Sequence, residues 1–473
     1  MPITYEVAID RYAEVQGNIL KGHGRRNAAF LFIDFRNNGA QAAVREWIAD
    51  LLTGNNGQPK LTSTAQQLGE TEAYKASGKA AGGAPFASLM LSGEAYAYFE
   101  EDMPEAPNQA VPPFGVPRTM GAFEGGMRVE ETRALLEDPA FAEWEGQWFQ
   151  EDGTPTTIHA LLMLADSDPA TLENLVQAVH GRLDSFGATV QVQENGNVLE
   201  RDLGSGIKEG IEHFGYADGV SQPIYLSNDI QPATDSPLDT LLEAEQLVLV
   251  EEPQTGSFGS FFVFRKLGQD VDNFKKEEDE VATGALQQQA AAGHFPFKND
   301  VGAMMVGRLE PGTPAVLLDP DNPPQLVHPI NNNFNYSGDP DGLKCPFHAH
   351  IRKVNPRSGA ADEIHHRLTR RGIPYGQPGE KEVGLLFMAY QRNINQQFEF
   401  IQKIWADNVS FPKASTGLDP VIGQGTRSNV SVAFTWGQQP KGNTPFRQFV
   451  TLLGGEYFYV PSLLALEALT RVV

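Results

Sequence analysis

The chain has 473 residues, a formal net charge of −24 at pH 7 and a single cysteine, Cys345. The length predicts two domains, because single hydrophobic cores stop growing at roughly 250 to 300 residues. The negative charge argues against a nucleic-acid partner, since affinity for a phosphate backbone comes mainly from Lys and Arg. We attribute the negative charge to the solubility of the protein. A lone cysteine cannot form a disulfide within the chain or build a thiolate metal centre, so redox chemistry would need a cofactor.

Neither a transmembrane helix nor a secretory signal is evident in the sequence. No uninterrupted apolar run reaches the length needed to cross a bilayer. The N-terminal segment MPITYEVAIDRYAEVQGNIL lacks a basic stretch followed by an apolar stretch and a cleavage site. We therefore expect a cytoplasmic protein without a membrane partner.

The first half of the chain alternates between strand and helix patterns. Apolar runs predict strands over residues 28–35, 86–91, 157–164 and 188–193, and helical spacing predicts helices over residues 41–52, from Glu94 and over residues 169–183. Asp168 is the expected N-cap of the last helix, and Asn195 with Gly196 predicts a turn. Residues 54–85 show no sustained period, so we expect a surface loop there. We interpret the order as β-α-β-β-α-β, which is typical of a ferredoxin-like unit.

The second half repeats these patterns less clearly. Strands are expected over residues 257–264, 383–390 and 449–460, with a helix over residues 398–405. Residues 266–382 contain too many insertions for an element list. The sequence therefore predicts an α+β protein with two ferredoxin-like domains, each a four-stranded antiparallel sheet with helices, over residues 1–200 and 201–473.

Three segments of the second half combine ionisable residues with Gly or Pro. They are FGYADGVSQP at residues 214–223, CPFHAHIRKVNPR at residues 345–357 and RRGIPYG at residues 370–376. Gly215 and Gly219 bracket Asp218, which predicts a tight turn that holds a carboxylate at a backbone corner. A carboxylate, an imidazole and a guanidinium presented by loops are groups that suit peroxide chemistry, although an ordinary Asp turn has the same pattern.

These segments resemble the dye-decolorizing peroxidase family, whose G-x-x-D-G motif is matched by residues 215–219. The opening segment VQGNILKGHG at residues 15–24 and the tail FRQFVTLLGGEYFYVPS at residues 446–462 are similar to the same family. The resemblance implies two ferredoxin-like domains, with one haem b per chain held in the C-terminal domain.

The resemblance also implies how the haem is held. The family's H-x-R-x-x-N-P-R pattern selects His350 as the axial iron ligand, with His348 as its competitor. An axial imidazole usually donates its other ring N–H to a carboxylate, for which Asp419 is our first candidate and Asp407 our second. The residues expected to contact the cofactor are Gly219, Val220, Ser221, Asn355, Pro356, Arg357 and Arg370.

On the opposite haem face the resemblance implies Asp218 and Arg370 as the catalytic pair. The family's arginine lies four residues before the Pro of R-x-G-x-P-Y-G, which selects Arg370 and not Arg371. Alternation along the strand places Leu385 and Phe387 on one face, and the resemblance puts them over the distal haem face, although plain core packing is equally open.

The expected reaction is reduction of hydrogen peroxide and oxidation of dyes and small aromatic or phenolic donors through a ferryl haem with a porphyrin radical. Asp218 would move the peroxide proton as base and then acid, while Arg370 would stabilise the departing oxygen. Bulky dyes could not enter a pocket narrowed by Leu385 and Phe387, so electrons would leave through aromatic side chains. Tyr375, Tyr390 and Trp405 are candidates for this role, but aromatic residues are more often core.

Two other functions fit parts of the same pattern. Related ferredoxin-like haem proteins handle haem or iron or split chlorite, but Asp218 argues against them. A haem carrier or sensor without catalysis stays open. We expect a monomer or a homodimer.

Overall fold

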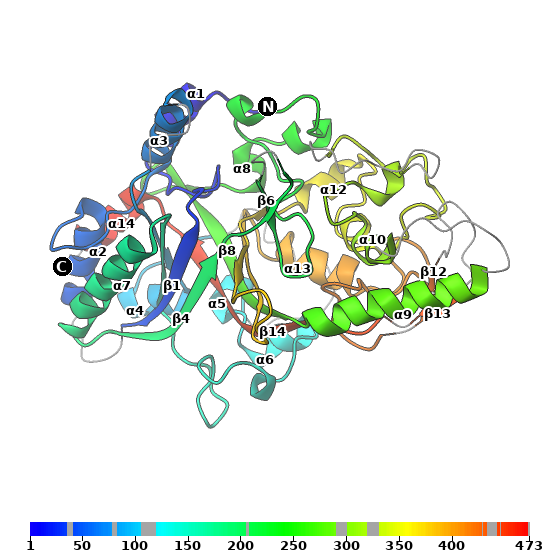
Figure 1. Cartoon of the computed structure of the whole chain (residues 1–473). Coiled ribbons are helices and arrows are strands. Elements are labelled where there is room, and N and C mark those ends of the chain that lie inside the picture. Colours follow the sequence, from blue (N-terminus) through cyan, green and yellow to red (C-terminus); the bar gives the residue numbers. More distant parts are fainter. Residues whose placement is uncertain are drawn as a thin grey trace.

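The computed structural model describes residues 1–35, 41–77, 83–105, 120–204, 208–289, 300–318, 331–427, 429–432, 442–444 and 446–471. Figure 1 shows two groups of strands side by side, with helices packed around them. The helices are α1 (Tyr5–Arg11), α2 (Gln41–Thr53), α3 (Thr64–Ala76), α4 (Gly93–Phe99), α5 (Ala122–Gly125), α6 (Glu130–Leu135), α7 (Pro169–Asp184), α8 (Ala244–Leu247), α9 (Val271–Gln289), α10 (Asp300–Val306), α11 (His350–Lys353), α12 (Ala361–His365), α13 (Phe398–Phe400), which continues as a π-helical turn (Ile401–Ala406), and α14 (Leu463–Arg471). None of the described helices is both long and apolar enough to cross a membrane.

One large antiparallel sheet runs through both halves. Its main strands are β1 (Asn27–Asp34), β2 (Phe86–Leu91), β3 (Ala160–Asp166), β4 (Thr189–Asn197), β8 (Ser257–Gln269), β10 (Ile373–Tyr375), β11 (Gly384–Gln391) and β14 (Val450–Val460). They lie in the order β10-β11-β8-β14-β2-β3-β1-β4, while β7 (Val250–Glu252) pairs with β8 and β9 (Thr369–Arg370) pairs with β11. Two further sheets pair β5 (Leu199–Asp202) with β6 (Lys208–Ile211) and β12 (Val430–Val432) with β13 (Gly442–Thr444).

This strand order contains the ferredoxin-like unit twice. One half consists of β1 to β4, and the other of β8, β10, β11 and β14. When the strands of each half are numbered in chain order, both halves have the same spatial order: fourth, first, third, second. The two halves join where Tyr459 of β14 pairs with Leu91 of β2. The predicted α+β class with two ferredoxin-like units is therefore confirmed.

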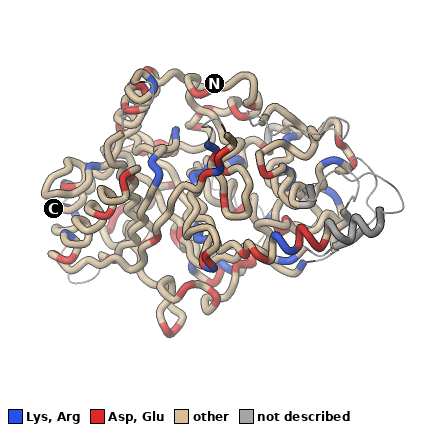
Figure 2. Tube along the Cα trace, in the orientation of Figure 1, with Lys and Arg blue, Asp and Glu red and all other residues tan. Residues whose placement is uncertain are grey.

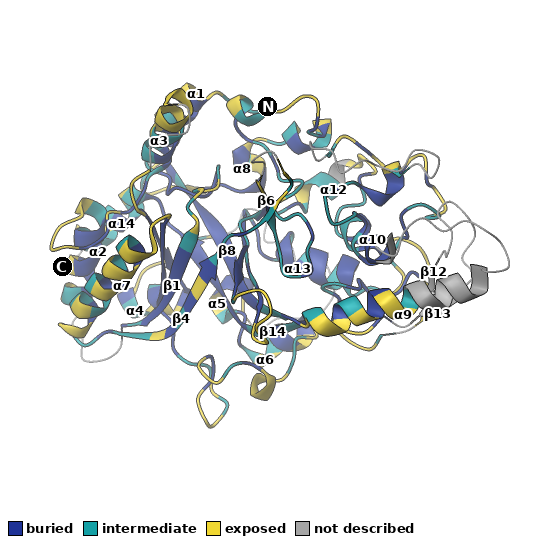
Figure 3. Cartoon of the chain, viewed as in Figure 1, coloured by how far each residue is buried: buried dark blue, intermediate teal, exposed yellow. Residues whose placement is uncertain are grey.

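Side-chain alternation along β1 divides the core into two layers. Phe30 and Phe32 point into the central core, whereas Leu31 and Ile33 belong to the outer core under helices α2, α7 and α14. Figure 3 shows the consequence, since β1 is buried while the outer face of α7 and parts of the edge strand β4 are exposed.

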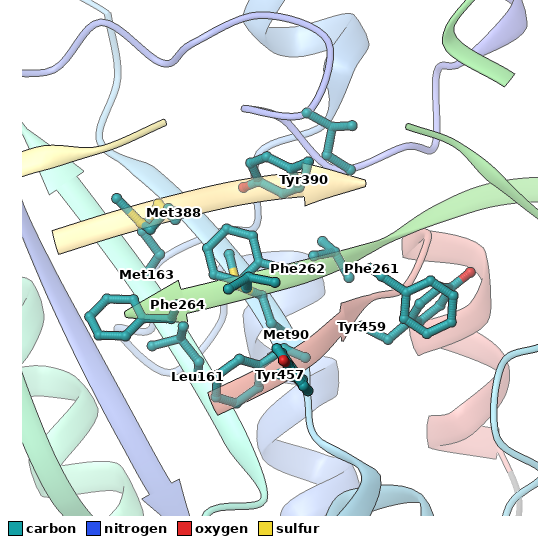
Figure 4. Close-up of a cluster of buried hydrophobic side chains, with 14 of the residues drawn as sticks. Met90, Leu161, Met163, Phe261, Phe262, Phe264, Met388, Tyr390, Tyr457 and Tyr459 are labelled. Carbon is teal, nitrogen blue, oxygen red and sulfur yellow. The ribbon is translucent and has the colours of Figure 1, made fainter. Parts of the chain in front are cut away.

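The central core joins the two halves. Figure 4 shows side chains from β8, β11 and β14 packed together with Met90, Leu161 and Met163 of the first half. The rings of Phe32 and Phe264 lie 4.9 Å apart, centroid to centroid. Asp and Glu residues are spread over both halves rather than gathered in one part (Figure 2).

Two expectations from the sequence are wrong. In both cases contacts with a distant segment of the chain decide the local structure. Helix α3 lies inside the expected loop 54–85, because Ser63 caps it and its buried face makes polar contacts with the N-terminal segment instead of forming an apolar stripe. Asn195 and Gly196 continue β4 instead of turning, because they pair with β1. A Cβ atom on Gly196 would lie 2.5 Å from Ile373 of β10, so the glycine permits a close approach of two strands.

Candidate active site

A cavity of about 260 Å³ lies where the loop after β6 meets β9 and β11. Four of the side chains predicted from the sequence line it, namely Asp218, Arg370, Leu385 and Phe387. Gly219, which was also predicted as a site residue, lines it as well, and Gln222, Arg371 and Gly372 complete its wall. The structure thus brings together two of the three motif segments and one strand.

Strand β11 presents Leu385 and Phe387 to this cavity by simple alternation. Leu386 and Met388, on the other face, are buried in the central core. Leu385 and Phe387 are only half-buried, because their face borders the cavity.

Asp218 lies in a tight turn between two glycines. Gly215 has a φ of +96° and Gly219 a φ of +70°, values that a residue with a Cβ rarely adopts. The Gly219 N–H donates to Asp218 Oδ1 at 2.6 Å. Burial raises the pKa of Asp218, while this hydrogen bond and the charge of Arg370 act to lower it.

Arg370 is tied to the Asp218 loop through both its backbone and its side chain. Its backbone N–H donates to Gln222 Oε1 at 3.1 Å, and Nη2 donates to the carbonyl oxygens of Val220 at 2.7 Å and Ser221 at 3.2 Å. Burial lowers the pKa of Arg370, and the charge of Asp218 opposes this shift. Asp218 and Arg370 therefore interact electrostatically and share a support in the loop after β6.

Arg371 also lines the cavity, which the sequence pattern did not indicate. Its Nε and Nη2 donate to the carbonyl oxygens of Asn18 at 2.8 Å and Ile19 at 3.0 Å. The segment VQGNILKGHG is therefore held against the rim of the cavity, with Asn18 Nδ2 donating to the hydroxyl of Tyr390 at 3.2 Å.

His350 opens α11, and its ring is hydrogen-bonded to a buried carboxylate. Nδ1 lies 2.9 Å from Oδ2 of Asp419, whose side chain is fully buried, while the His350 side chain is 20% exposed. The N–H groups of Val421 and Ile422 donate to the other oxygen of Asp419. Burial alone would raise the pKa of Asp419, but His350 and these N–H groups hold it below its ordinary value.

The other candidates for the His350 site have different surroundings. Asp407 accepts from Gln402 Nε2 and the backbone N–H of Gln424, and burial raises its pKa to about 7. His348 is buried, and burial lowers its pKa to about 4. His366 stacks on Phe400, and its neighbour His365 is exposed.

Arg357 connects residues 345–357, the histidine segment that contains His350, with residues 214–223, the Asp218 loop. Its Nη2 donates to Ser221 Oγ at 2.8 Å, and Nη1 donates to the carbonyl oxygens of Asn332 and Phe334. Asn355 and Pro356 are half-buried in the turn between α11 and Arg357. All three motif segments are therefore in contact in the folded chain.

The aromatic candidates for electron transfer are buried. Tyr375, Tyr390 and Trp405 are at most 7% exposed. Tyr375 and Tyr390 belong to the central core, and Trp405 stacks on Phe411 at 5.4 Å. None of them is the surface side chain that a bulky donor could contact directly.

Three residues that support the site were missed. Glu212 accepts from the backbone N–H groups of Phe214 and Tyr216, and its buried carboxyl group has a pKa raised to about 7. Lys353 donates to three backbone carbonyls in the loop before Asp419. Gln222 binds the Arg370 backbone. The partners of these residues are backbone groups or lie far away in the sequence. The only sequence signal for these residues is therefore their position in or next to a motif segment.

Comparisons with known proteins agree with this fold and identify the family. Residues 234–411 match the model of the family described as Dyp-type peroxidase, C-terminal. The multifunctional dye peroxidase DyP2 of Amycolatopsis sp. is 38% identical over 96% of this chain and 95% of its own. The dye-decolorizing peroxidase msp1 of Mycetinis scorodonius is 31% identical over 74% of this chain and 72% of its own.

Solved structures give the same result. The crystal structure of an Anabaena sp. DyP-type peroxidase is similar with a TM-score of 0.84 and 32% identity, covering 99% of this chain and 97% of that one. The fold and the matches define an oxidoreductase of the peroxidase class, built from two ferredoxin-like units. The chain belongs to the dye-decolorizing peroxidase family, whose members are haem enzymes.

Proposed function

We propose that this chain reduces hydrogen peroxide at the cavity lined by Asp218 and Arg370 and oxidises dyes and small aromatic or phenolic donors. The observation that carries this proposal is the convergence of the Asp218 carboxylate and the Arg370 guanidinium on a single cavity of about 260 Å³, beside Arg371 and two apolar side chains of β11. Such a cavity has room for peroxide but is small for a dye.

The residues fit a haem with His350 as its axial ligand. Because Nδ1 of His350 faces Asp419 at 2.9 Å, that nitrogen carries the proton and Nε2 keeps its lone pair for a metal. Within the described ranges no three His, Cys, Asp or Glu side chains gather around one point, so His350 would bind iron as a single protein ligand, as an axial haem ligand does.

The charges nearby also suit the carboxylates of a haem. Arg308, Arg357 and Arg370 have hydrogen bonds to neutral oxygen atoms, and in the described part of the chain no carboxylate lies within ion-pair distance of them. Burial and the charges of the other two lower the pKa of Arg308 to about 9. A bound dianion would relieve this repulsion.

The proposed mechanism assigns one task to each group. When bound, a haem would supply redox-active iron for the reaction with peroxide and the donor. Asp218 in its ionised form accepts the proton of one peroxide oxygen and returns it to the other, which leaves as water. Arg370 stabilises the negative charge on the departing oxygen, and Leu385 and Phe387 keep bulky molecules out.

Several finer points belong to the same proposal. The cofactor is haem b, with one haem per chain, and it contacts Gly219, Val220, Ser221, Asn355 and Pro356. The protein is a monomer or homodimer with a cytoplasmic location. The boundary between its two domains lies near residue 200. The boundary is supported by the end of β4 at Asn197, since β4 is the last strand of the first ferredoxin-like unit.

The purified protein tests the proposal directly. We expect stoichiometric haem and a rapid change of the Soret band when hydrogen peroxide is added, followed by its return when a dye or phenol is supplied. Haem that is weakly bound or does not respond to peroxide would instead favour a carrier or sensor.

A further inference from the structure

We propose that Gln222 is a further polar group of the peroxide site, whose side-chain oxygen fixes Arg370 and whose nitrogen donates a hydrogen bond to the ligand in the cavity. This inference rests on the proposed roles of Asp218 and Arg370. Gln222 lies four residues after Asp218 and lines the same cavity.

The orientation of the Gln222 carboxamide is determined by its contact with Arg370. The backbone N–H of Arg370 lies 3.1 Å from Oε1, and only the oxygen of a carboxamide can accept from an N–H group. The NH2 group is therefore on the other side of the carboxamide.

This NH2 group has no acceptor among the described residues. Some fully buried glutamines use both ends of the carboxamide, whereas Gln269 and Gln391 each leave one end without a partner in the described part of the chain. Gln16 accepts from Leu89 and donates to Pro461, and Gln397 accepts from Asn393 and donates to Leu247. Gln222 has only its oxygen engaged while its side chain borders a cavity, so its two N–H groups are available to a ligand there.

Gln222 also completes a reciprocal contact between the two supports of the site. The side chain of Arg370 donates to the backbone of Val220 and Ser221, and the side chain of Gln222 accepts from the backbone of Arg370. Because Asp218 belongs to the same loop, this contact fixes the loop and strand β9 relative to each other.

The chemistry of the amide complements that of its neighbours. Asp218 supplies an acceptor and Arg370 a charged donor, whereas Gln222 supplies a neutral donor whose strength does not change with pH. No bond forms or breaks at Gln222, since it donates a hydrogen bond to an oxygen of peroxide and loses no proton. The arrangement predicts that a small anion on the iron is stabilised in the same way.

Fluoride binding to the ferric holoprotein tests this role without turnover. We expect Gln222→Met, which removes both ends of the amide, to weaken fluoride binding about tenfold to a hundredfold, the cost of a hydrogen bond to a charged acceptor. Gln177→Met, the same exchange on the exposed face of α7, should bind fluoride like the parent.

Gln222→Glu tests the donor end of the side chain separately from the acceptor end. It also tests the donor role if Gln222→Met does not fold. It keeps an oxygen for the Arg370 N–H but replaces the NH2 group, so its fluoride affinity should fall more steeply with rising pH than that of the parent. Parent-like fluoride binding by Gln222→Glu at every pH would overturn the donor role, whatever Gln222→Met shows.

The proposed function fails in a different way. If Asp218→Asn and Arg370→Leu leave the peroxide reaction of the parent unchanged, the site itself is wrongly assigned. If these two variants are impaired while both Gln222 variants bind fluoride like the parent, only the inference about Gln222 is wrong.

Discussion

Nδ1 of His350 lies 2.9 Å from Oδ2 of Asp419, although 69 positions separate the two residues in the chain. The loop of Asp419 is held next to α11 by Lys353, whose ammonium group donates to three of its backbone carbonyls. The pair fixes which nitrogen of His350 carries the proton and leaves the other available for the proposed bond to iron.

His350→Ala should abolish stable haem binding or move the iron to another ligand, because it removes the proposed axial nitrogen. His348→Ala should leave the Soret band nearly unchanged, since His348 lies in the histidine segment but lacks the Asp419 contact. Haem content and the visible spectrum of both variants provide the measurement. Loss of haem in the His348 variant alone would reverse the assignment.

Asp419→Asn should lower the rate of the peroxide reaction about 10- to 100-fold, a typical cost of removing a partner of a metal ligand. The amide carries no charge, so His350 becomes a weaker donor to the iron and the midpoint potential of the haem should rise. Asp407→Asn is the matched control, because the pKa of Asp407 is already raised to about 7 and the amide mimics its neutral form. Equal effects in stopped-flow and potentiometric measurements would contradict a special role for Asp419.

Arg370→Leu should slow the peroxide-dependent change of the Soret band by about 10²- to 10³-fold, which is the cost of removing a positioned electrostatic group. Arg371→Leu should affect the rate much less but reduce stability, since it leaves the carbonyl oxygens of Asn18 and Ile19 without their donor. Stopped-flow traces and thermal unfolding of both variants separate these effects. A slower reaction in the Arg371 variant than in the Arg370 variant would mean that the proposed catalytic arginine is shifted by one residue.

The pH profile should reflect the ionisation of Asp218. A carboxyl group acts as a base only when ionised, so the rate of the peroxide reaction should fall as the pH drops through the pKa of Asp218. Burial raises this pKa, so the acid limb should lie above the ordinary carboxyl value of about 3.9. The profile should still be acidic compared with that of a histidine base.

Asp218→Asn removes the ionising group and should abolish this acid limb together with most of the rate. The peroxide reaction of both proteins, followed from pH 3 to 8, provides the comparison. An undiminished rate in Asp218→Asn, with an unchanged pH profile, would remove Asp218 from the mechanism.

The sequence was sufficient for features that depend on short-range patterns. Alternation in residues 383–390 placed Leu385 and Phe387 on one face, since successive side chains of a strand point to opposite sides. The two glycines around Asp218 indicated a tight turn, because glycine tolerates positive φ angles. The resemblance to the dye-decolorizing peroxidase family selected His350, Asp218 and Arg370 as site residues.

Only the tertiary structure decided between candidates whose difference lies in long-range contacts. Asp407 directly follows the helical segment that ends at Ala406, and Asp419 lies in the loop beyond it. Only Asp419 reaches His350, because the chain between the two aspartates folds back onto Lys353. Helix α3 and the role of Arg371 were hidden for the same reason, since their partners lie in the N-terminal segment. A local pattern determines which way a side chain points, whereas the packing of distant segments determines what it meets there.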